Sequence, residues 1–84
     1  MTGGPGCSSE MAVFYENGPM RLEYGLPVKN EISWNNKSNL VFLDNPIGTG
    51  FSKGSIFNMP RNEKKVSEYF GIFIEKFYEI YPEF

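Results

Sequence analysis

The sequence predicts an α/β protein, and two segments carry that prediction. Residues 40–43 form a short apolar run without alternation, which is typical of a strand covered on both faces in the middle of a parallel sheet. Between residues 62 and 81 the apolar side chains recur at helical spacing and polar ones lie mostly on the other side, which predicts a long amphipathic helix. Together with the loops and the short helix that precede them, these segments form part of an α/β pattern.

Shorter elements are expected before the apolar run. Residues 10–16 suit a short helix, which Asn17-Gly18-Pro19 would end, because glycine favours a helix C-terminus and proline cannot continue it. Residues 20–24 alternate apolar and charged side chains, which predicts a half-buried strand that Gly25 and Pro27 interrupt.

A second short strand is predicted around residues 32–34, followed by a polar turn at residues 35–39. A loop rich in glycine and serine is expected at residues 47–60. The chain has 84 residues and no internal domain boundary, so residues 1–84 are treated as one unit. One central strand and one long helix do not enclose a core, and an exposed strand of this composition would aggregate. The sequence therefore indicates a piece of a larger domain.

Composition excludes several classes of function. The net charge is −2 and no basic run is longer than Lys64-Lys65, so nucleic acid is not an expected partner. No apolar run is long enough to span a bilayer, and the first residues do not have the basic and then apolar pattern of a targeting segment. The chain has no histidine and a single cysteine, so neither a metal site, a cofactor nor an internal disulfide is expected.

A glycine-rich stretch at residues 2–9 stands out near the start of the chain. Three glycines and one proline lie between residues 3 and 6, and two serines follow at positions 8 and 9. Glycine permits positive φ and close approach to the backbone, and proline fixes its own φ. A fixed loop of this kind, entering a helix, is suited to holding negative charge on its backbone N–H groups.

Two glycine patterns later in the chain are weaker. Residues 50–54 match Gly-x-Ser-x-Gly, but a nucleophile elbow needs a strand directly before it and a helix directly after it. Without histidine, Ser52 has no ordinary base, so a glycine turn after the strand is the favoured interpretation. Gly48-Thr49-Gly50 nearly begins a dinucleotide fingerprint, but Lys53 stands where the third glycine belongs.

Two side chains are further candidates. Glu16 follows an apolar stretch and precedes a tight turn, so its burial is plausible, although a surface position at the helix end is the interpretation that spacing alone favours. Asn36-Lys37-Ser38 is an N-glycosylation sequon in a polar turn, and it matters only if the chain enters the secretory pathway.

Five blocks of sequence, in order and across essentially the whole chain, closely resemble serine carboxypeptidases. Residues 9–19 look most like the plant and vacuolar branch, and the family's Asp-Gln-Pro is here Asp44-Asn45-Pro46. The blocks are residues 2–9 (TGGPGCSS), 14–19 (FYENGP), 33–35 (SWN), 43–52 (LDNPIGTGFS) and 77–84 (FYEIYPEF).

The resemblance implies a partial α/β-hydrolase fold with an oxyanion loop, a central parallel strand and a long amphipathic helix. It also implies an enzyme that removes single residues from peptide C-termini with a Ser-Asp-His triad, usually at acidic pH. In the family the nucleophile follows the helix that ends this chain, and the aspartate and histidine come later. The chain alone is therefore expected to be inactive. An acyltransferase with the same fold, and an inactive truncated product, remain alternatives.

The resemblance also implies roles for particular residues. The backbone N–H of Gly4 corresponds to an oxyanion-hole donor, and Thr2, Gly3 and Glu16 correspond to groups that hold the substrate's terminal carboxylate. Glu16 would have to be protonated to donate to that carboxylate, which is a physical reason for an acidic optimum.

Three further implications concern binding and location. Met11 and Tyr15 match positions lining the pocket for the leaving residue. Cys7 matches a cysteine that pairs with a distant one, which this chain does not contain. The implied partner is a peptide C-terminus, and the implied location is the vacuole or the extracellular space.

Overall fold

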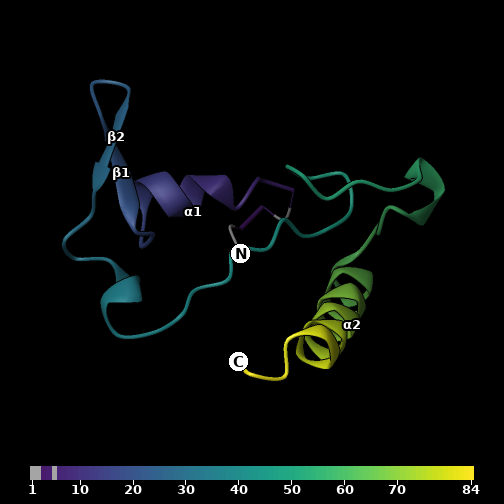
Figure 1. Ribbon diagram of the computed structural model, residues 1–84. Helices are drawn as coiled ribbons and strands as arrows, with labels where there is room; N and C mark the ends of the chain where they lie inside the picture. The colour runs from purple at the N-terminus through teal and green to yellow at the C-terminus, as the bar shows by residue number, and fades with distance from the viewer. Residues whose placement is uncertain (1–2, 5) are drawn as a thin grey trace.

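The computed structural model describes residues 3–4 and 6–84 of the chain. Helix α1 (Glu10–Tyr15) is followed by strands β1 (Met20–Glu23) and β2 (Leu26–Lys29), and a second helix, α2 (Glu63–Ile80), lies near the C-terminus. Short 3₁₀ helices form at Trp34–Asn36 and Ile56–Asn58. Figure 1 shows α1 and the β1–β2 hairpin together on one side, with α2 apart from them and long loops in between.

Helix α1 confirms the prediction of a short helix followed by a turn. The backbone N–H groups of Asn17 and Gly18 both donate to the carbonyl of Ala12, at 3.2 and 3.1 Å, and so end the helix. A Cβ at position 18 would lie 2.2 Å from the carbonyl oxygen of Val13. Only glycine therefore lets the chain leave α1 in this direction.

The hairpin confirms a strand at residues 20–23, although three of its four residues are exposed, and adds a strand, β2, that the sequence did not predict. β2 pairs antiparallel with β1, from Met20 opposite Lys29 to Glu23 opposite Leu26. Tyr24 and Gly25 connect them, both at positive φ (51° and 79°), as the favoured two-residue hairpin turn requires. The predicted break at Pro27 was therefore wrong, because a two-stranded ribbon has free edges on which proline is tolerated.

The segment at residues 32–34 is not the strand that the sequence predicted. Ser33 is buried and caps the 3₁₀ helix Trp34–Asn36, its side chain accepting from the N–H of Asn35 at 3.1 Å. A serine hydroxyl that bonds the local backbone in this way favours a turn over a strand ladder.

The predicted central parallel strand at residues 40–43 is not formed in this structure. The sheet among the described residues has two strands, β1 and β2, and residues 40–43 belong to neither. Periodicity records the apolar character of a buried strand, but a strand also needs a neighbour to bond, and no described segment provides one. Val41 is accordingly 54% exposed.

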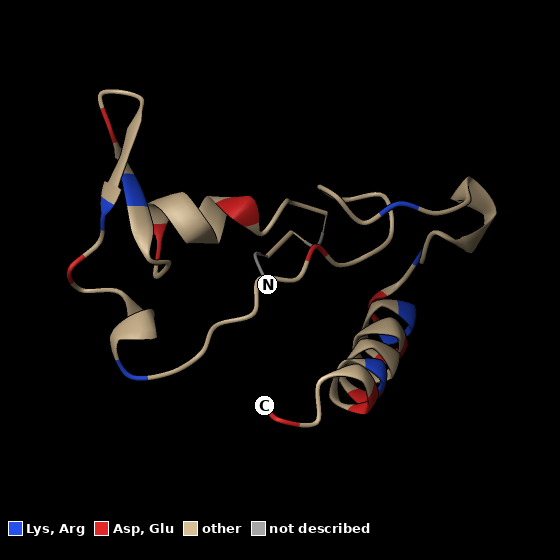
Figure 2. Ribbon diagram, viewed as in Figure 1, with Lys and Arg blue, Asp and Glu red and all other residues tan. Residues whose placement is uncertain are grey.

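Helix α2 confirms the prediction of a long helix. The Asn62 side chain accepts from the N–H of Lys65 at 3.0 Å, which caps its first turn. Basic and acidic residues follow one another along the ribbon of α2 (Figure 2). Two exposed ion pairs, Lys65–Glu68 and Lys76–Glu79, span adjacent turns. The C-terminal aromatic rings contact one another at centroid distances of 5.3–6.4 Å, and they are Phe73, Phe77, Tyr78, Tyr81 and Phe84. None of the helices in the described ranges is long and apolar enough to cross a membrane.

The molecule is open, with almost no core. Its accessible surface is 6574 Å², whereas a folded monomer of 9.6 kDa exposes about 5,100 Å². Its radius of gyration is 14.4 Å, against about 12 Å for a compact domain of this length. Ala12 is the one fully buried hydrophobic residue among those described. The apolar surface of α2 and of residues 40–43 therefore lacks a cover within the described chain.

The isolated chain is expected to unfold without a cooperative transition. Too little apolar area is buried to offset the conformational entropy of folding. Circular dichroism at 222 nm should decline gradually on heating, and a hydrophobic dye should bind already at 25 °C. A sharp transition together with dispersed amide signals would contradict this expectation.

Candidate functional site

The described residues of the glycine-rich stretch, 3–4 and 6–9, lead into α1 as a tight loop. Gly4 and Gly6 have φ of 146° and 122°, which disfavour any residue with a side chain. A Cβ on Gly4 would lie 3.3 Å from the nitrogen of Gly6 and 3.4 Å from Sγ of Cys7. The described part of the loop therefore has little room to change shape. Thr2, a predicted site residue, lies outside the described residues.

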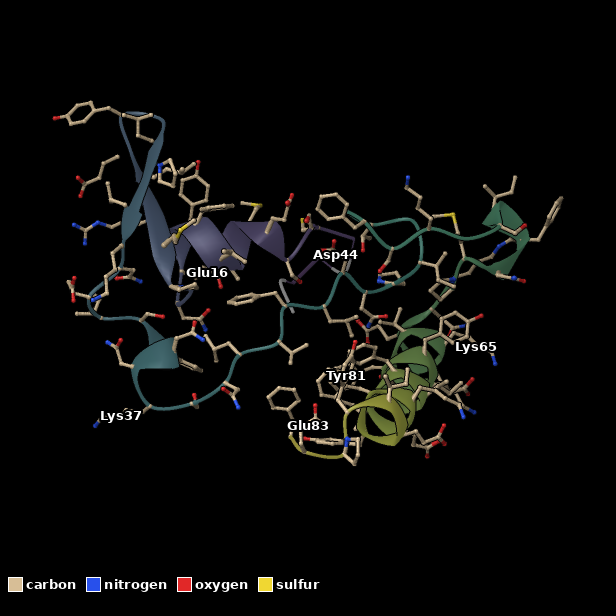
Figure 3. All side chains as sticks on the ribbon, viewed as in Figure 1. Glu16, Lys37, Asp44, Lys65, Tyr81 and Glu83 are labelled. Carbon is tan, nitrogen blue, oxygen red and sulfur yellow. The ribbon has the colours of Figure 1, made fainter. Side chains whose placement is uncertain are left out.

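Helix α1 carries three of the predicted site residues. Met11 and Tyr15 are four positions apart and so share one face of the helix, where they are 51% and 69% exposed. Glu16 is the C-cap residue and is also exposed, so the plausible burial of its carboxylate is not found and the surface position is. Figure 3 shows Glu16 and Asp44 near opposite ends of α1.

Glu16 lines a shallow pocket. The volume is about 220 Å³, and the lining residues are Ala12, Glu16, Asn17, Trp34, Leu40, Val41 and Phe42. The side-chain oxygen of Asn17 is buried with no hydrogen-bond partner in the structure. The pocket therefore has one charged group on its wall, the Glu16 carboxylate, whereas the buried Asn17 oxygen is not open to a ligand in it.

The turn after Glu16 is held by buried polar side chains. Asn30 donates through Nδ2 to the carbonyl of Gly18 at 2.9 Å and through its backbone N–H to the carbonyl of Pro19 at 2.8 Å. The carbonyl of Asn17 accepts from Oγ of Ser33 and from the N–H of Trp34, both at 3.1 Å. Asn30 and Ser33 are only 7% and 6% exposed, so these bonds fix the backbone next to Glu16.

Asp44 connects the other end of α1 to a distant loop. Its Oδ1 accepts from Oγ of Ser8 at 3.0 Å and from the N–H of Ser9 at 2.6 Å, and its Oδ2 accepts from the N–H of Phe51 at 2.8 Å. The Phe51 and Ser9 N–H groups hold the pKa of Asp44 below its ordinary value, and partial desolvation opposes them only in part. Ser9 also donates from Oγ to the carbonyl of Leu43.

Sequence reasoning missed this cluster. It identified Asp44 as part of a family block, Asp44-Asn45-Pro46, without assigning it a structural role. The available signal was a carboxylate after such a run, with paired serines at one loop and Gly50 at another. Gly50 has φ of 49°, and a Cβ there would lie 2.0 Å from Oδ2 of Asp44. The glycine pattern at residues 48–52 is therefore explained by close approach to a carboxylate.

The turn at residues 48–52 also shows whether the Gly-x-Ser-x-Gly pattern forms a nucleophile elbow or a glycine turn. Ser52 donates from its N–H to the carbonyl of Thr49 at 2.9 Å and accepts from the N–H of Gly48 at 2.8 Å. No strand directly precedes the turn and no helix directly follows it. The pattern forms the predicted glycine turn and lacks the framework of a nucleophile elbow.

Comparison with known proteins identifies the family. The family model described as serine carboxypeptidase matches residues 1–84, the whole chain. The chain belongs to the serine carboxypeptidase family. It is 44% identical over 86 residues to Serine carboxypeptidase 3 of Oryza sativa subsp. japonica and 45% identical over 86 residues to Serine carboxypeptidase 3 of Hordeum vulgare. It is 44% identical over 85 residues to the pheromone-processing carboxypeptidase kex1 of Penicillium rubens.

These matches cover only part of each relative. All of this chain is aligned, but it spans 17% of the length of the rice and barley proteins and 14% of the Penicillium protein. The family as a whole has an α/β-hydrolase fold. The helices and the hairpin seen here are consistent with a part of that fold. These relatives are thus several times longer than this chain, which agrees with the open, uncovered surface.

Two predicted residues lie outside the cluster around α1. Asn36 is exposed in the first 3₁₀ helix and donates from Nδ2 to the carbonyl of Glu31 at 2.6 Å. Cys7 is an exposed free thiol in the glycine loop. Across residues 3–4 and 6–84, no group of three or more histidine, cysteine, aspartate or glutamate side chains could hold a metal ion.

Replacing Gly18 with alanine should destabilise the complete domain. A suitable protein is a full-length chimaera in which this chain replaces the matched segment of the rice Serine carboxypeptidase 3. We expect Gly18→Ala to lower the free energy of unfolding by at least about 2 kcal/mol, because the clash is with backbone that cannot turn away. Urea denaturation measures the change.

Gly71→Ala is the matched control for that experiment. Nothing lies within 4 Å of a Cβ at position 71, which is inside α2. Alanine should therefore stabilise the helix by up to roughly 1 kcal/mol. Equal effects of the two substitutions would show that the turn after α1 has no special requirement for glycine.

The contribution of Asp44 to stability should depend on pH. A carboxyl whose pKa is lower in the folded than in the unfolded state stabilises the fold above the unfolded pKa, and that stabilisation is lost as pH falls through the folded pKa. The chimaera should therefore melt at a higher temperature than its Asp44→Asn variant at pH 7, and the difference should shrink below about pH 4. Glu31→Gln, at an exposed surface ion pair, is the control and should show little difference at either pH. A gap between chimaera and Asp44→Asn that stays constant down to pH 2 would contradict this assignment.

Proposed function

We propose that this chain is part of a serine-type carboxypeptidase and supplies half of its active site. The observation that carries the proposal is the family match across all 84 residues, which includes the glycine loop and α1. The reaction is hydrolysis of the last peptide bond of a peptide substrate. The chain contributes hydrogen-bond donors that stabilise negative charge on the substrate. The nucleophile and the general base come from elsewhere in the domain.

The oxyanion donor is the backbone N–H of Gly4. A tetrahedral intermediate of peptide hydrolysis places negative charge on the former carbonyl oxygen, and one well-placed donor to that oxygen is typically worth about 3 kcal/mol. The loop suits this role because its glycines adopt φ values that other residues disfavour. A donor fixed before the reaction costs no reorganisation when the charge develops.

The substrate's terminal carboxylate is held by Thr2, Gly3 and Glu16. Glu16 can donate a hydrogen bond to a carboxylate only when it is protonated, which favours activity in acid. Met11 and Tyr15, exposed on one face of α1, line the pocket for the leaving residue.

The rest of the domain completes the site. With no histidine among the 84 residues, the general base of the triad must lie outside them. Residues 40–43 become the central parallel strand of an α/β-hydrolase sheet when neighbouring strands bond them, which would also cover the exposed Val41. Cys7 pairs with a cysteine in the rest of the domain, and the enzyme works in the vacuole or outside the cell.

Activity should require the complete domain. The isolated chain is expected to show no turnover of an N-blocked dipeptide, whereas the full-length chimaera should release the C-terminal amino acid. The physical reason is the missing nucleophile and base. Turnover by the isolated chain that a fluorophosphonate abolishes would refute the division of roles, and a folded chimaera without activity would refute the proposed function.

Glu16→Ala in the chimaera tests carboxylate recognition within the same assay. The KM should rise at least tenfold for a substrate with a free terminal carboxylate, and the residual rate on its C-terminal amide should not change. Equal losses on both substrates would assign Glu16 a structural role. Product analysis in the presence of a small alcohol separates hydrolysis from acyl transfer.

We also propose that Asn36 carries an N-linked glycan. The sequon lies in an exposed 3₁₀ turn, and the structure has open surface around it. When the chimaera is secreted from a eukaryotic host, peptide N-glycosidase should reduce the mass of this segment. Ser38→Ala should abolish the mass change and Asn35→Gln, which leaves the sequon intact, should not. An unmodified segment in the secreted protein would exclude the glycan.

A further inference from the structure

Asp44 joins three segments that are far apart in the sequence. Its carboxylate accepts hydrogen bonds from Ser8 and Ser9 at the start of α1 and from Phe51 in the turn at residues 48–52. The residue itself ends the apolar run, whose last carbonyl, that of Leu43, accepts from the Ser9 hydroxyl. Ser9 is 1% exposed, whereas Phe51 is largely exposed, so the junction is buried on its Ser9 side.

The contacts require a carboxylate rather than an amide. Two of the three donors are backbone N–H groups, and they approach different oxygens of Asp44. A carboxylate accepts at both oxygens, whereas an asparagine side chain accepts at only one and presents an NH₂ group at the other. Hydrogen bonds to a charged acceptor are also roughly twice as strong as neutral ones. Asparagine at position 44 would therefore lose the hydrogen bond to one of the two segments, either at Ser9 or at Phe51.

Holding Ser8 and Ser9 also holds the glycine loop before them. A Cβ added to Gly4 would lie 3.3–3.5 Å from Gly6 and Cys7, and one added to Gly6 would lie 4.0 Å from Cγ2 of Thr49. The loop is therefore folded closely on itself and runs beside the turn at residues 48–52. Thr49 is itself 6% exposed and donates from Oγ1 to the carbonyl of Pro46 at 2.8 Å.

Gly50 makes the approach of Asp44 possible. A Cβ at this position would lie 2.0 Å from Oδ2 of Asp44 and 2.7 Å from Oγ of Ser8. Any side chain there would push the carboxylate away from the Phe51 N–H and from Ser8. The glycine at position 50 and the carboxylate at position 44 therefore act as one unit.

We propose that Asp44 is a positioning residue, which fixes the glycine loop so that the Gly4 N–H points at the oxyanion. This inference rests on the proposed function, in which the loop is the oxyanion hole. Asp44 does not touch the substrate. It acts through Ser8 and Ser9, and the turn at residues 48–52 is the fixed support on its other side.

The test compares Asp44→Asn with the unmodified full-length chimaera. Active sites are counted by fluorophosphonate titration, and kcat is expressed per titrated site. We expect kcat to fall 10- to 100-fold and KM to stay within threefold, because a displaced donor is lost only in the transition state. A peptide aldehyde, which forms a tetrahedral adduct with the nucleophile, should bind more weakly by a similar factor.

Three further variants sharpen the comparison. Gly50→Ala should reproduce the loss of kcat, since it displaces the same carboxylate, and Ser8→Ala should cause a smaller loss, since it removes one of three hydrogen bonds. Glu31→Gln removes an exposed carboxylate elsewhere and should leave kcat unchanged. If Asp44→Asn lowers the number of titratable sites or the melting temperature while kcat per site is unchanged, Asp44 is structural only and the inference is overturned.

Hydrogen exchange separates this inference from the proposed function. The peptide covering residues 3–9 should exchange faster in Asp44→Asn than in the chimaera, and Glu31→Gln should not change its rate. If the folded chimaera hydrolyses no peptide, the proposed function fails, and the exchange data still decide whether Asp44 holds the loop. Unchanged exchange in Asp44→Asn would overturn the inference whatever the activity.

Discussion

The carboxylate of Asp44 is the interaction on which the described site depends. The chain has almost no apolar core, so polar bonds between loops determine where its functional groups lie. The two carboxylate oxygens of Asp44, at the end of the apolar run, accept hydrogen bonds from the start of α1 and from the turn at residues 48–52. At the other end of α1, Asn30 and Ser33 donate hydrogen bonds to the turn after Glu16. The short helix is thus fixed at both ends by buried polar groups rather than by burial of its own apolar face.

This arrangement separates two tasks within one small region of a serine carboxypeptidase. The backbone of the glycine loop is shaped by positive φ values that only glycine adopts readily, and its position is set from outside by a side chain. Met11 and Tyr15, the residues of α1 proposed to face the substrate, are exposed and take no part in those supports. Substitutions on the exposed face can therefore change what is bound without disturbing the geometry of the loop, whereas substitutions in the supports affect both.

Much of the local structure could be predicted from the sequence, because its causes are local. Helical spacing, the cap at Asn62 and the glycine after α1 lie within a few residues of the elements they define. The predictions that failed concern residues whose hydrogen-bonding partners are distant in the sequence or are not among the described residues. Residues 40–43 have the composition of a central strand but no described neighbour to bond, and Asp44 acts through residues about 35 positions away. The resemblance assigned roles to Gly4 and Glu16, yet neither spacing nor resemblance indicated what holds them in place.

Helix α2 has a consequence for how such a protein is made. It carries its own N-terminal cap at Asn62, two ion pairs along its outer side and a cluster of aromatic rings near its end. At 18 residues it exceeds the length at which isolated helices are only marginal. Its length and its local cap let α2 begin to form from its own residues. Until its aromatic side chains are covered, they are an apolar surface through which partly folded chains can associate.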